Sequence, residues 1–142
     1  MDSRMIFALL QQAYGEIKWW PGDPYAIMAG AVLTQNTTWK NVEKSLALLG
    51  TQLQPLTIAG MSEAMLQQLI VPSGFYRAKA ATLKRLTAWY GRYDFLPARV
   101  QQKTLLEVRT DLLALKGIGP ETADDILTYA FQMPSFVIDA YT

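Results

Sequence analysis

The feature that most constrains this chain is a tight Gly-Ile-Gly-Pro turn at residues 117–120, which separates two apolar runs with helical spacing. The spacing predicts helices over residues 103–115 and 121–131, joined by a very short hairpin. Two glycines allow a phosphate to come close to the backbone, and a helix N-terminus carries partial positive charge. The hairpin is therefore predicted to hold a nucleic-acid backbone, although an ordinary helix–helix turn explains the glycines alone equally well.

The remainder of the chain also has helical period, and no stretch alternates as a strand would, so the fold is expected to be all-α. Residues 24–34 are apolar all round, which is typical of a helix at the centre of a bundle. Further helices are predicted over residues 3–14, through Val42, Leu46 and Leu49, from Ser62 to about Ile70, and from Phe75 to about Tyr90. In the last of these, Ala78, Ala81, Leu83 and Leu86 are expected inside, and Lys79, Lys84 and Arg85 outside.

The composition narrows the chemistry that this chain can perform. Its 142 residues include no cysteine and no histidine, which excludes disulfides, thiol nucleophiles, cysteine-ligated clusters and imidazole catalysis within it. Catalysis would have to use carboxylates, lysines, hydroxyls or the backbone. No apolar run approaches the roughly 20 residues needed to span a bilayer, so no membrane contact and a cytoplasmic, nucleoid-associated location are expected.

The net charge of +1 conceals an uneven distribution. Between residues 75 and 116, nine basic residues stand against three acidic ones, Asp94, Glu107 and Asp111. This excess can form a local phosphate-binding face, or simply a solvated helix face. The basic residues are Arg77, Lys79, Lys84, Arg85, Arg92, Arg99, Lys103, Arg109 and Lys116.

Four motifs in order resemble those of a known family. They are Ala31-Val32-Leu33-Thr34-Gln35-Asn36-Thr37, Gly74-Phe75-Tyr76-Arg77-Ala78-Lys79-Ala80, Leu115-Lys116-Gly117-Ile118-Gly119-Pro120-Glu121-Thr122-Ala123 and Val137-Ile138-Asp139. Together they resemble the helix-hairpin-helix DNA glycosylases of the endonuclease III superfamily, which implies an all-α bundle or barrel of that type. The segments Trp19-Trp20-Pro21 and Leu33-Thr34-Gln35-Asn36-Thr37 with Trp39 are most similar to the endonuclease III-like 3-methyladenine glycosylases.

The resemblance implies a partner, double-stranded DNA with a damaged base, and a role for each motif. Asp139 would be catalytic, because a carboxylate beside the sugar can stabilise its oxocarbenium character or orient the attacking water. Trp19, Trp20, Pro21 and Trp39 would line the base pocket, since electron-rich aromatics stack on a cationic alkylated purine. Contacts to DNA are implied for Gln35, Asn36, Lys79, Lys116, Gly117 and Gly119, and the backbone carbonyls of Leu113, Leu115 and Ile118 would hold a monovalent cation.

Each of these roles has a purely structural alternative. Asp139 could cap a following helix, as Asp commonly does. Gln35 and Asn36 could end a helix, and the tryptophans could belong to the core. Lys79 could lie on a solvated face. The motif order, rather than any single residue, favours the catalytic interpretation.

One departure from the family concerns the reaction itself. Bifunctional members carry a lysine just after the hairpin that attacks the sugar, and the matching residue here is Glu121, which cannot form a Schiff base. A monofunctional glycosylase that hydrolytically removes alkylated purines, 3-methyladenine above all, is therefore expected. The alternatives are an oxidised-pyrimidine or mismatch glycosylase of the endonuclease III type and a non-catalytic DNA-binding module.

A second departure is the early end of the chain. Family members continue well beyond the aspartate, so residues 1–20 are expected to belong to an incomplete second domain, largely missing here. Residues 21–133 would form a six-helix-type domain with its hairpin at 115–120, and residues 134–142 would begin the return into the second domain. An iron–sulfur cluster is excluded in this chain but not in a longer parent protein, and a truncated chain could be completed by oligomerisation.

Overall fold

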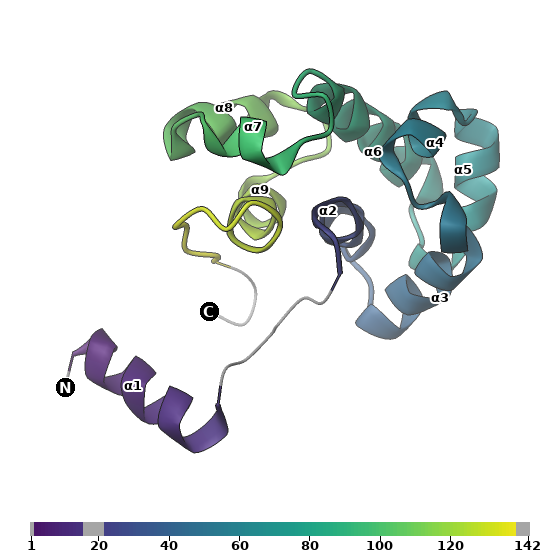
Figure 1. The fold of residues 1–142 in the computed structure, drawn as a ribbon. Helices are drawn as coiled ribbons and strands as arrows, with labels where there is room; N and C mark the ends of the chain where they lie inside the picture. The colour runs from purple at the N-terminus through teal and green to yellow at the C-terminus, as the bar shows by residue number, and fades with distance from the viewer. Residues whose placement is uncertain (1, 16–21, 139–142) are drawn as a thin grey trace.

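The computed structural model describes residues 2–15 and 22–138. In these ranges the chain forms helices and no strand, which confirms the all-α prediction (Figure 1). The α-helices are α1 (Ser3–Tyr14), α2 (Pro24–Leu33), α3 (Trp39–Leu49), α4 (Pro55–Gly60), α5 (Glu63–Ile70), α6 (Tyr76–Gly91), α7 (Pro97–Gln101), α8 (Leu105–Ala114) and α9 (Pro120–Asp125). Two short 3-10 turns, Gly50–Gln52 and Val71–Ser73, and one π-helical turn, Ile126–Ala130, complete the list.

Helix α2 occupies the centre of the bundle. Its N-terminus is fixed by Asp23, whose carboxylate accepts a hydrogen bond from the Ala26 N–H at 3.0 Å, and by Pro24 at the first helical position. The helix has no polar face, and helices α3 to α8 form an arc around it and α9 (Figure 1). The prediction of a central buried helix is thus confirmed, because an all-apolar helix has no side that favours water.

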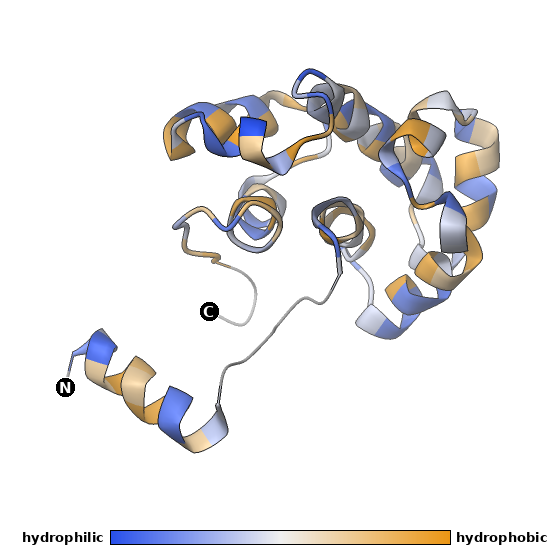
Figure 2. Cartoon of the chain, viewed as in Figure 1, coloured by the Kyte–Doolittle hydropathy of each residue, from blue (hydrophilic) through white to orange (hydrophobic). Residues whose placement is uncertain are grey.

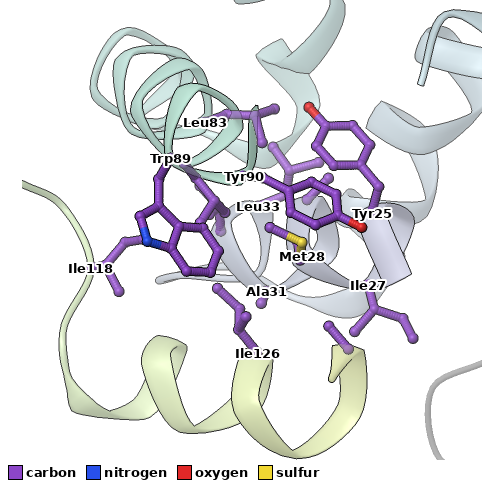
Figure 3. Close-up of a cluster of buried hydrophobic side chains, with 14 of the residues drawn as sticks. Tyr25, Ile27, Met28, Ala31, Leu33, Leu83, Trp89, Tyr90, Ile118 and Ile126 are labelled. Carbon is purple, nitrogen blue, oxygen red and sulfur yellow. The ribbon is translucent and has the colours of Figure 1, made fainter. Parts of the chain in front are cut away.

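Aromatic side chains fill the space between α2, α6 and the second arm of the hairpin (Figure 3). Tyr25 stacks on Tyr90 with ring centroids 6.3 Å apart, and its hydroxyl shares a 2.7 Å hydrogen bond with Thr87. Trp89 and Tyr90 both pack against Phe131, which follows the π-helical turn. These contacts join the hairpin to the centre of the bundle.

Helix α1 contributes no buried residue, although Asp2 caps it through a 2.9 Å hydrogen bond to the Met5 N–H. Figure 2 colours stretches of this helix orange for their hydrophobic residues, and these side chains are exposed; Phe7, for example, is 65% exposed. The predicted helix over residues 3–14 is confirmed. Its assignment to a second domain stays a prediction, as do the other domain boundaries. None of the helices in the described ranges has the length and apolarity of a membrane span.

Two kinds of sequence prediction need correction. Helices α4 and α7 lie in stretches where no helix was predicted, because each is a short element that begins at a proline and has few periodic positions. On α6, Ala78 was expected inside but is exposed, whereas Lys79 was expected outside but is buried. A long lysine side chain can enter a core when its ammonium finds acceptors there.

Candidate functional site

A cleft of about 320 Å³ lies between the loop that follows α2 and the turn that precedes α9. The cleft thus brings together two of the sequence motifs, which are separated by about 80 residues in the chain. Its described lining residues are Ala31, Thr34, Gln35, Asn36, Gly117, Gly119, Pro120, Glu121, Thr122 and Asp125.

Lys79 fixes the end of α2 at the edge of this cleft. Its ammonium donates hydrogen bonds to the carbonyls of Leu33, at 2.8 Å, and Ser73, at 2.6 Å, and the residue is only 3% exposed. Burial lowers the pKa of Lys79 to about 8. The prediction that Lys79 lies on the outer surface and contacts a DNA phosphate is therefore corrected: it supports the C-terminal turn of α2, where cations are favourable.

The loop after α2 is held at both ends. The Thr34 N–H continues the helix with a 2.9 Å hydrogen bond to the Gly30 carbonyl, and the Thr38 hydroxyl caps α3. Between them, Asn36 is exposed and has a φ of 52°. Asn is among the few residues that adopt this left-handed conformation readily, because its short side chain bonds locally.

Gln35 connects this loop to the hairpin. Its side-chain Nε2 donates a hydrogen bond of 3.0 Å to the Gly117 carbonyl and one of 2.9 Å to the Thr122 hydroxyl. One acceptor is the first residue of the glycine turn, and the other lies in α9, just after the turn. The sequence motifs suggested that Gln35 contacts DNA or ends a helix. They did not indicate that its side chain bridges the loop and the hairpin.

The two glycines of the turn differ in their surroundings. Gly117 has a φ of 95°, and a Cβ placed there would lie 2.0 Å from the Thr82 hydroxyl on α6. Gly119 has extended backbone, and a Cβ placed there would meet no atom within 4 Å. Gly117 is thus needed for the close approach of the hairpin to α6, whereas Gly119 leaves open space in front of the α9 N-terminus.

Basic residues border the turn on its α6 side. The Lys116 carbonyl accepts hydrogen bonds from the Arg85 guanidinium at 3.3 Å and from the Thr82 hydroxyl at 3.4 Å. The Lys116 side chain is exposed. Lys116 and Arg85 therefore place two cations beside the turn, on the side that faces α6.

The cation site expected from the resemblance stays a prediction. It would use the carbonyls of Leu113, Leu115 and Ile118, and the Leu115 carbonyl already accepts a 3.1 Å hydrogen bond from the Ile118 N–H. A carbonyl oxygen has a second lone pair, so this bond leaves room for a cation. In residues 2–15 and 22–138, no group of three or more acidic, histidine or cysteine side chains is placed to hold a metal ion.

Two carboxylates line the cleft from the first two turns of α9. Glu121 is exposed, and Asp125, four residues later on the same helix face, is only 8% exposed. No lysine or arginine occurs among the described lining residues. The sequence reading missed Asp125 and Thr122, although the four-residue spacing from Glu121 could have indicated Asp125.

A buried carboxylate braces the second arm of the hairpin. Asp124 accepts hydrogen bonds from the Arg109 guanidinium on α8 at 3.0 and 3.3 Å, and from the Ser135 hydroxyl at 2.8 Å. The hydrogen bonds to Asp124 raise the pKa of Arg109 further above its usual value. Asp124 thereby ties both hairpin arms to Ser135 in the segment that follows the π-helical turn.

Some predicted site residues lie outside the described ranges, namely Trp19, Trp20, Pro21 and Asp139. Of the proposed base-pocket residues, Trp39 is described: it occupies the first position of α3 and is 41% exposed. The structure therefore brings together the loop, the hairpin and the Lys116 region, and it leaves the catalytic and aromatic assignments as predictions.

Residues 29–140 match the HhH-GPD superfamily of base excision DNA repair proteins. The chain belongs to this superfamily. The match covers the loop, the hairpin and the segment after it, and it confirms the resemblance inferred from the four motifs. The buried Lys79 and the Gln35 bridge both lie within the matched residues.

Two curated relatives extend this finding. The chain is 42% identical over 144 residues to a proposed DNA repair glycosylase of Methanocaldococcus jannaschii, covering 96% of this chain and 64% of the relative. It is 32% identical over 124 residues to the endonuclease III of Thermotoga maritima, covering 84% of this chain and 53% of that enzyme. The chain therefore spans between about half and two thirds of the length of these relatives.

Solved structures share the fold. The 3-methyladenine DNA glycosylase of H. pylori bound to 1,N6-ethenoadenine superposes with a TM-score of 0.81 at 32% identity, covering 99% of this chain and 70% of that one. An endonuclease III in a trapped covalent intermediate with DNA superposes with a TM-score of 0.69 at 21% identity, covering 99% and 65%. The second likeness concerns the fold alone.

Proposed function

We propose that this chain acts as a monofunctional DNA N-glycosylase that flips an alkylated purine, 3-methyladenine above all, out of double-stranded DNA and hydrolyses its glycosidic bond. The observation that carries the proposal is the cleft beside the hairpin. It combines a turn open to a phosphate at Gly119 with two carboxylates, Glu121 and Asp125. The likeness to the H. pylori 3-methyladenine glycosylase supports the same assignment.

The charge of the cleft supports a cationic substrate base. An N-alkylated purine carries positive charge, and its attraction to two carboxylates is strengthened where burial lowers the local dielectric. Asp125 is largely buried, and Glu121 lies on the same face of α9 and also lines the cleft. A neutral base would be attracted less strongly to the same carboxylates. The proposed aromatic contacts of Trp19, Trp20, Pro21 and Trp39 would add stacking to this attraction.

Hydrolysis without strand cleavage follows from the residue at the start of α9. Glu121 stands where bifunctional family members have their amine nucleophile, and a carboxylate forms no Schiff base. In our proposal, Asp139 stabilises the developing oxocarbenium ion or orients water, and the product is an abasic site. DNA is held by Gly119, Lys116 and the neighbouring backbone, with a monovalent cation at the carbonyls of Leu113, Leu115 and Ile118. We propose that this chain holds no cofactor of its own and that it acts at the nucleoid.

The endonuclease III of Thermotoga maritima gives a reason to test a second substrate class, oxidised pyrimidines or mismatched bases. Incubation with duplexes that contain 3-methyladenine, thymine glycol or a mismatch, followed by chromatography of the released bases, separates the candidates. We expect release of 3-methyladenine alone. Release of thymine glycol would favour the endonuclease III type, and binding of all duplexes without release would favour a DNA-binding module.

A further inference from the structure

The cleft beside the hairpin has an exposed mouth and a buried end. Asn36, Gly119 and Glu121 line the cleft and are exposed, whereas Ala31 and Asp125 line it and are only 1% and 8% exposed. Ala31 lies on α2 and Asp125 on α9, and these two helices lie side by side (Figure 1). A ligand that enters between the loop and the hairpin therefore meets Asp125 at the buried end.

The neighbouring Asp124 fixes the direction in which Asp125 faces. Consecutive residues of an α-helix point about 100° apart. The Asp124 carboxylate accepts hydrogen bonds from Arg109 on α8 and from Ser135, so α9 cannot rotate about its axis without breaking them. With Asp124 held on the α8 side, the Asp125 side chain is kept on the side of the cleft.

The helix also changes its geometry directly after Asp125. Residues Ile126–Ala130 form a π-helical turn, in which the Phe131 N–H donates a 3.2 Å hydrogen bond to the Ile126 carbonyl. Such turns are rare and occur frequently at functional sites. A small uncharged residue in place of Asp125 would fill this position without the free-energy cost of burying a charge. Both observations favour a role for the Asp125 carboxylate toward a ligand.

Burial distinguishes Asp125 from Glu121, which lies one turn earlier on the same helix face. Water and salt screen an exposed carboxylate strongly, whereas a buried one acts through a lower dielectric. A cation placed beside a buried carboxylate also recovers part of the cost of its burial. Because a carboxylate has about four acceptor positions, Asp125 can interact with the protein and still face a ligand. Asp125 should therefore attract a cation more strongly than Glu121 does.

We propose that Asp125 is the specificity-determining residue of the cleft: its carboxylate selects purines that carry a positive charge and disfavours neutral lesions of similar size. Glu121, at the exposed mouth, contributes less to this selection. The inference rests on the proposed glycosylase function and deepens it, because it assigns the choice of substrate to one side chain of α9.

Isosteric neutral variants of the two carboxylates test this proposal. The rates of single-turnover release are measured for 3-methyladenine and for 1,N6-ethenoadenine, a neutral base that the H. pylori glycosylase binds. Asp125→Asn should lower the ratio of the first rate to the second about 10-fold or more, because it removes the buried charge. The matched control Glu121→Gln should lower it less than about 3-fold, and Asp125→Glu, which keeps the charge, should retain most of the wild-type ratio. An equal fall of both rates in Asp125→Asn would overturn the proposal.

A binding measurement makes the test independent of catalysis. The full chain is titrated with 3,9-dimethyladeninium, which is permanently cationic, and with neutral 9-methyladenine, while NMR follows the backbone amides of the cleft. Wild type should bind the cation more tightly, and Asp125→Asn should lose this preference while Glu121→Gln keeps most of it. Equal binding of both compounds by wild type, or an unchanged preference in Asp125→Asn, would overturn the proposal. Release of neither base from DNA, together with a preference for the cation that depends on Asp125, would contradict the proposed function and still support the role of Asp125.

Discussion

Gly117 and Gly119 flank a single residue of the hairpin, yet neighbouring atoms constrain only Gly117. Sequence reasoning gave both glycines the same role, because it could not show that Thr82 on α6 lies against the turn. Lys79 illustrates the same limit: it belongs to a recognised motif, but its burial depends on the carbonyls of Leu33 and Ser73, which come from elsewhere in the chain. At the scale of single residues, the sequence indicated which residues belong to the site, but it did not indicate which atoms they contact.

The difference between the glycines predicts opposite effects of adding one methyl group. Gly117→Ala should lower the free energy of unfolding by about 1–3 kcal/mol, because the new Cβ meets the Thr82 hydroxyl at a strained positive φ. Gly119→Ala should leave it unchanged or raise it by up to about 1 kcal/mol, because its backbone is extended and the space is open. Urea unfolding measures both, and equal losses would contradict the assignment.

The Gly119→Ala variant also distinguishes an effect on DNA binding from an effect on protein stability. Gly119→Ala should weaken DNA binding, since its methyl group fills the space that we assign to a phosphate. Fluorescence anisotropy with an intact duplex would show this, and wild-type affinity would argue against phosphate binding at Gly119.

The buried Lys79 predicts an unusual dependence of stability on pH. Its pKa is lowered from 10.5 in the unfolded chain to about 8 in the folded protein, so the unfolded state binds the proton more tightly. Below pH 8, the folded protein carries the full free-energy cost of burying the ammonium. Between pH 8 and 10.5, the folded state has lost this proton and the unfolded state still binds it, so the free energy of unfolding rises by up to about 1.4 kcal/mol per pH unit. The free energy of unfolding of wild type, relative to Lys79→Met, should therefore rise between pH 8 and 10. A flat or falling difference would show that the Lys79 pKa is not lowered.

At the scale of elements, the long periodic helices were predictable and the short ones were not. Helices α2 and α5 begin at the predicted capping residues Asp23 and Ser62, and α6 is long enough for its apolar spacing to be recognised without a side-chain cap. Helices α4 and α7 are each too short to show a period. The brace between Arg109, Asp124 and Ser135 was also missed, since it joins α8, α9 and the segment after them.

Removing one side of this brace should destabilise the hairpin. Arg109→Met leaves the buried Asp124 carboxylate with the Ser135 hydroxyl and without its charged partner, so we expect a lower free energy of unfolding. The matched control is Arg99→Met, which breaks an exposed ion pair with Asp94 and should cost less than about 1 kcal/mol. Chemical denaturation of both variants tests the comparison, and a larger loss for Arg99→Met would contradict it.

At the scale of the whole molecule, the order of four motifs revealed the family, but only the folded chain shows that loop and hairpin share one cleft. The net charge of +1 also hides the cations beside the turn. We expect DNA affinity to fall as salt rises, and Lys116→Ala to reduce the slope of log K against log salt by about 1. Titrations at several salt concentrations test this, and a slope equal to that of wild type would remove Lys116 from the DNA contacts.

We propose that the chain cleaves a glycosidic bond and leaves the DNA strand intact. The most direct measurement incubates the protein with end-labelled DNA that contains 3-methyladenine and examines the strands before and after treatment with alkali. We expect intact strands before alkali, breaks at the damaged position after it, and no such breaks with Asp139→Asn. Breaks that appear before alkali, or none after it with wild type, would contradict a monofunctional glycosylase.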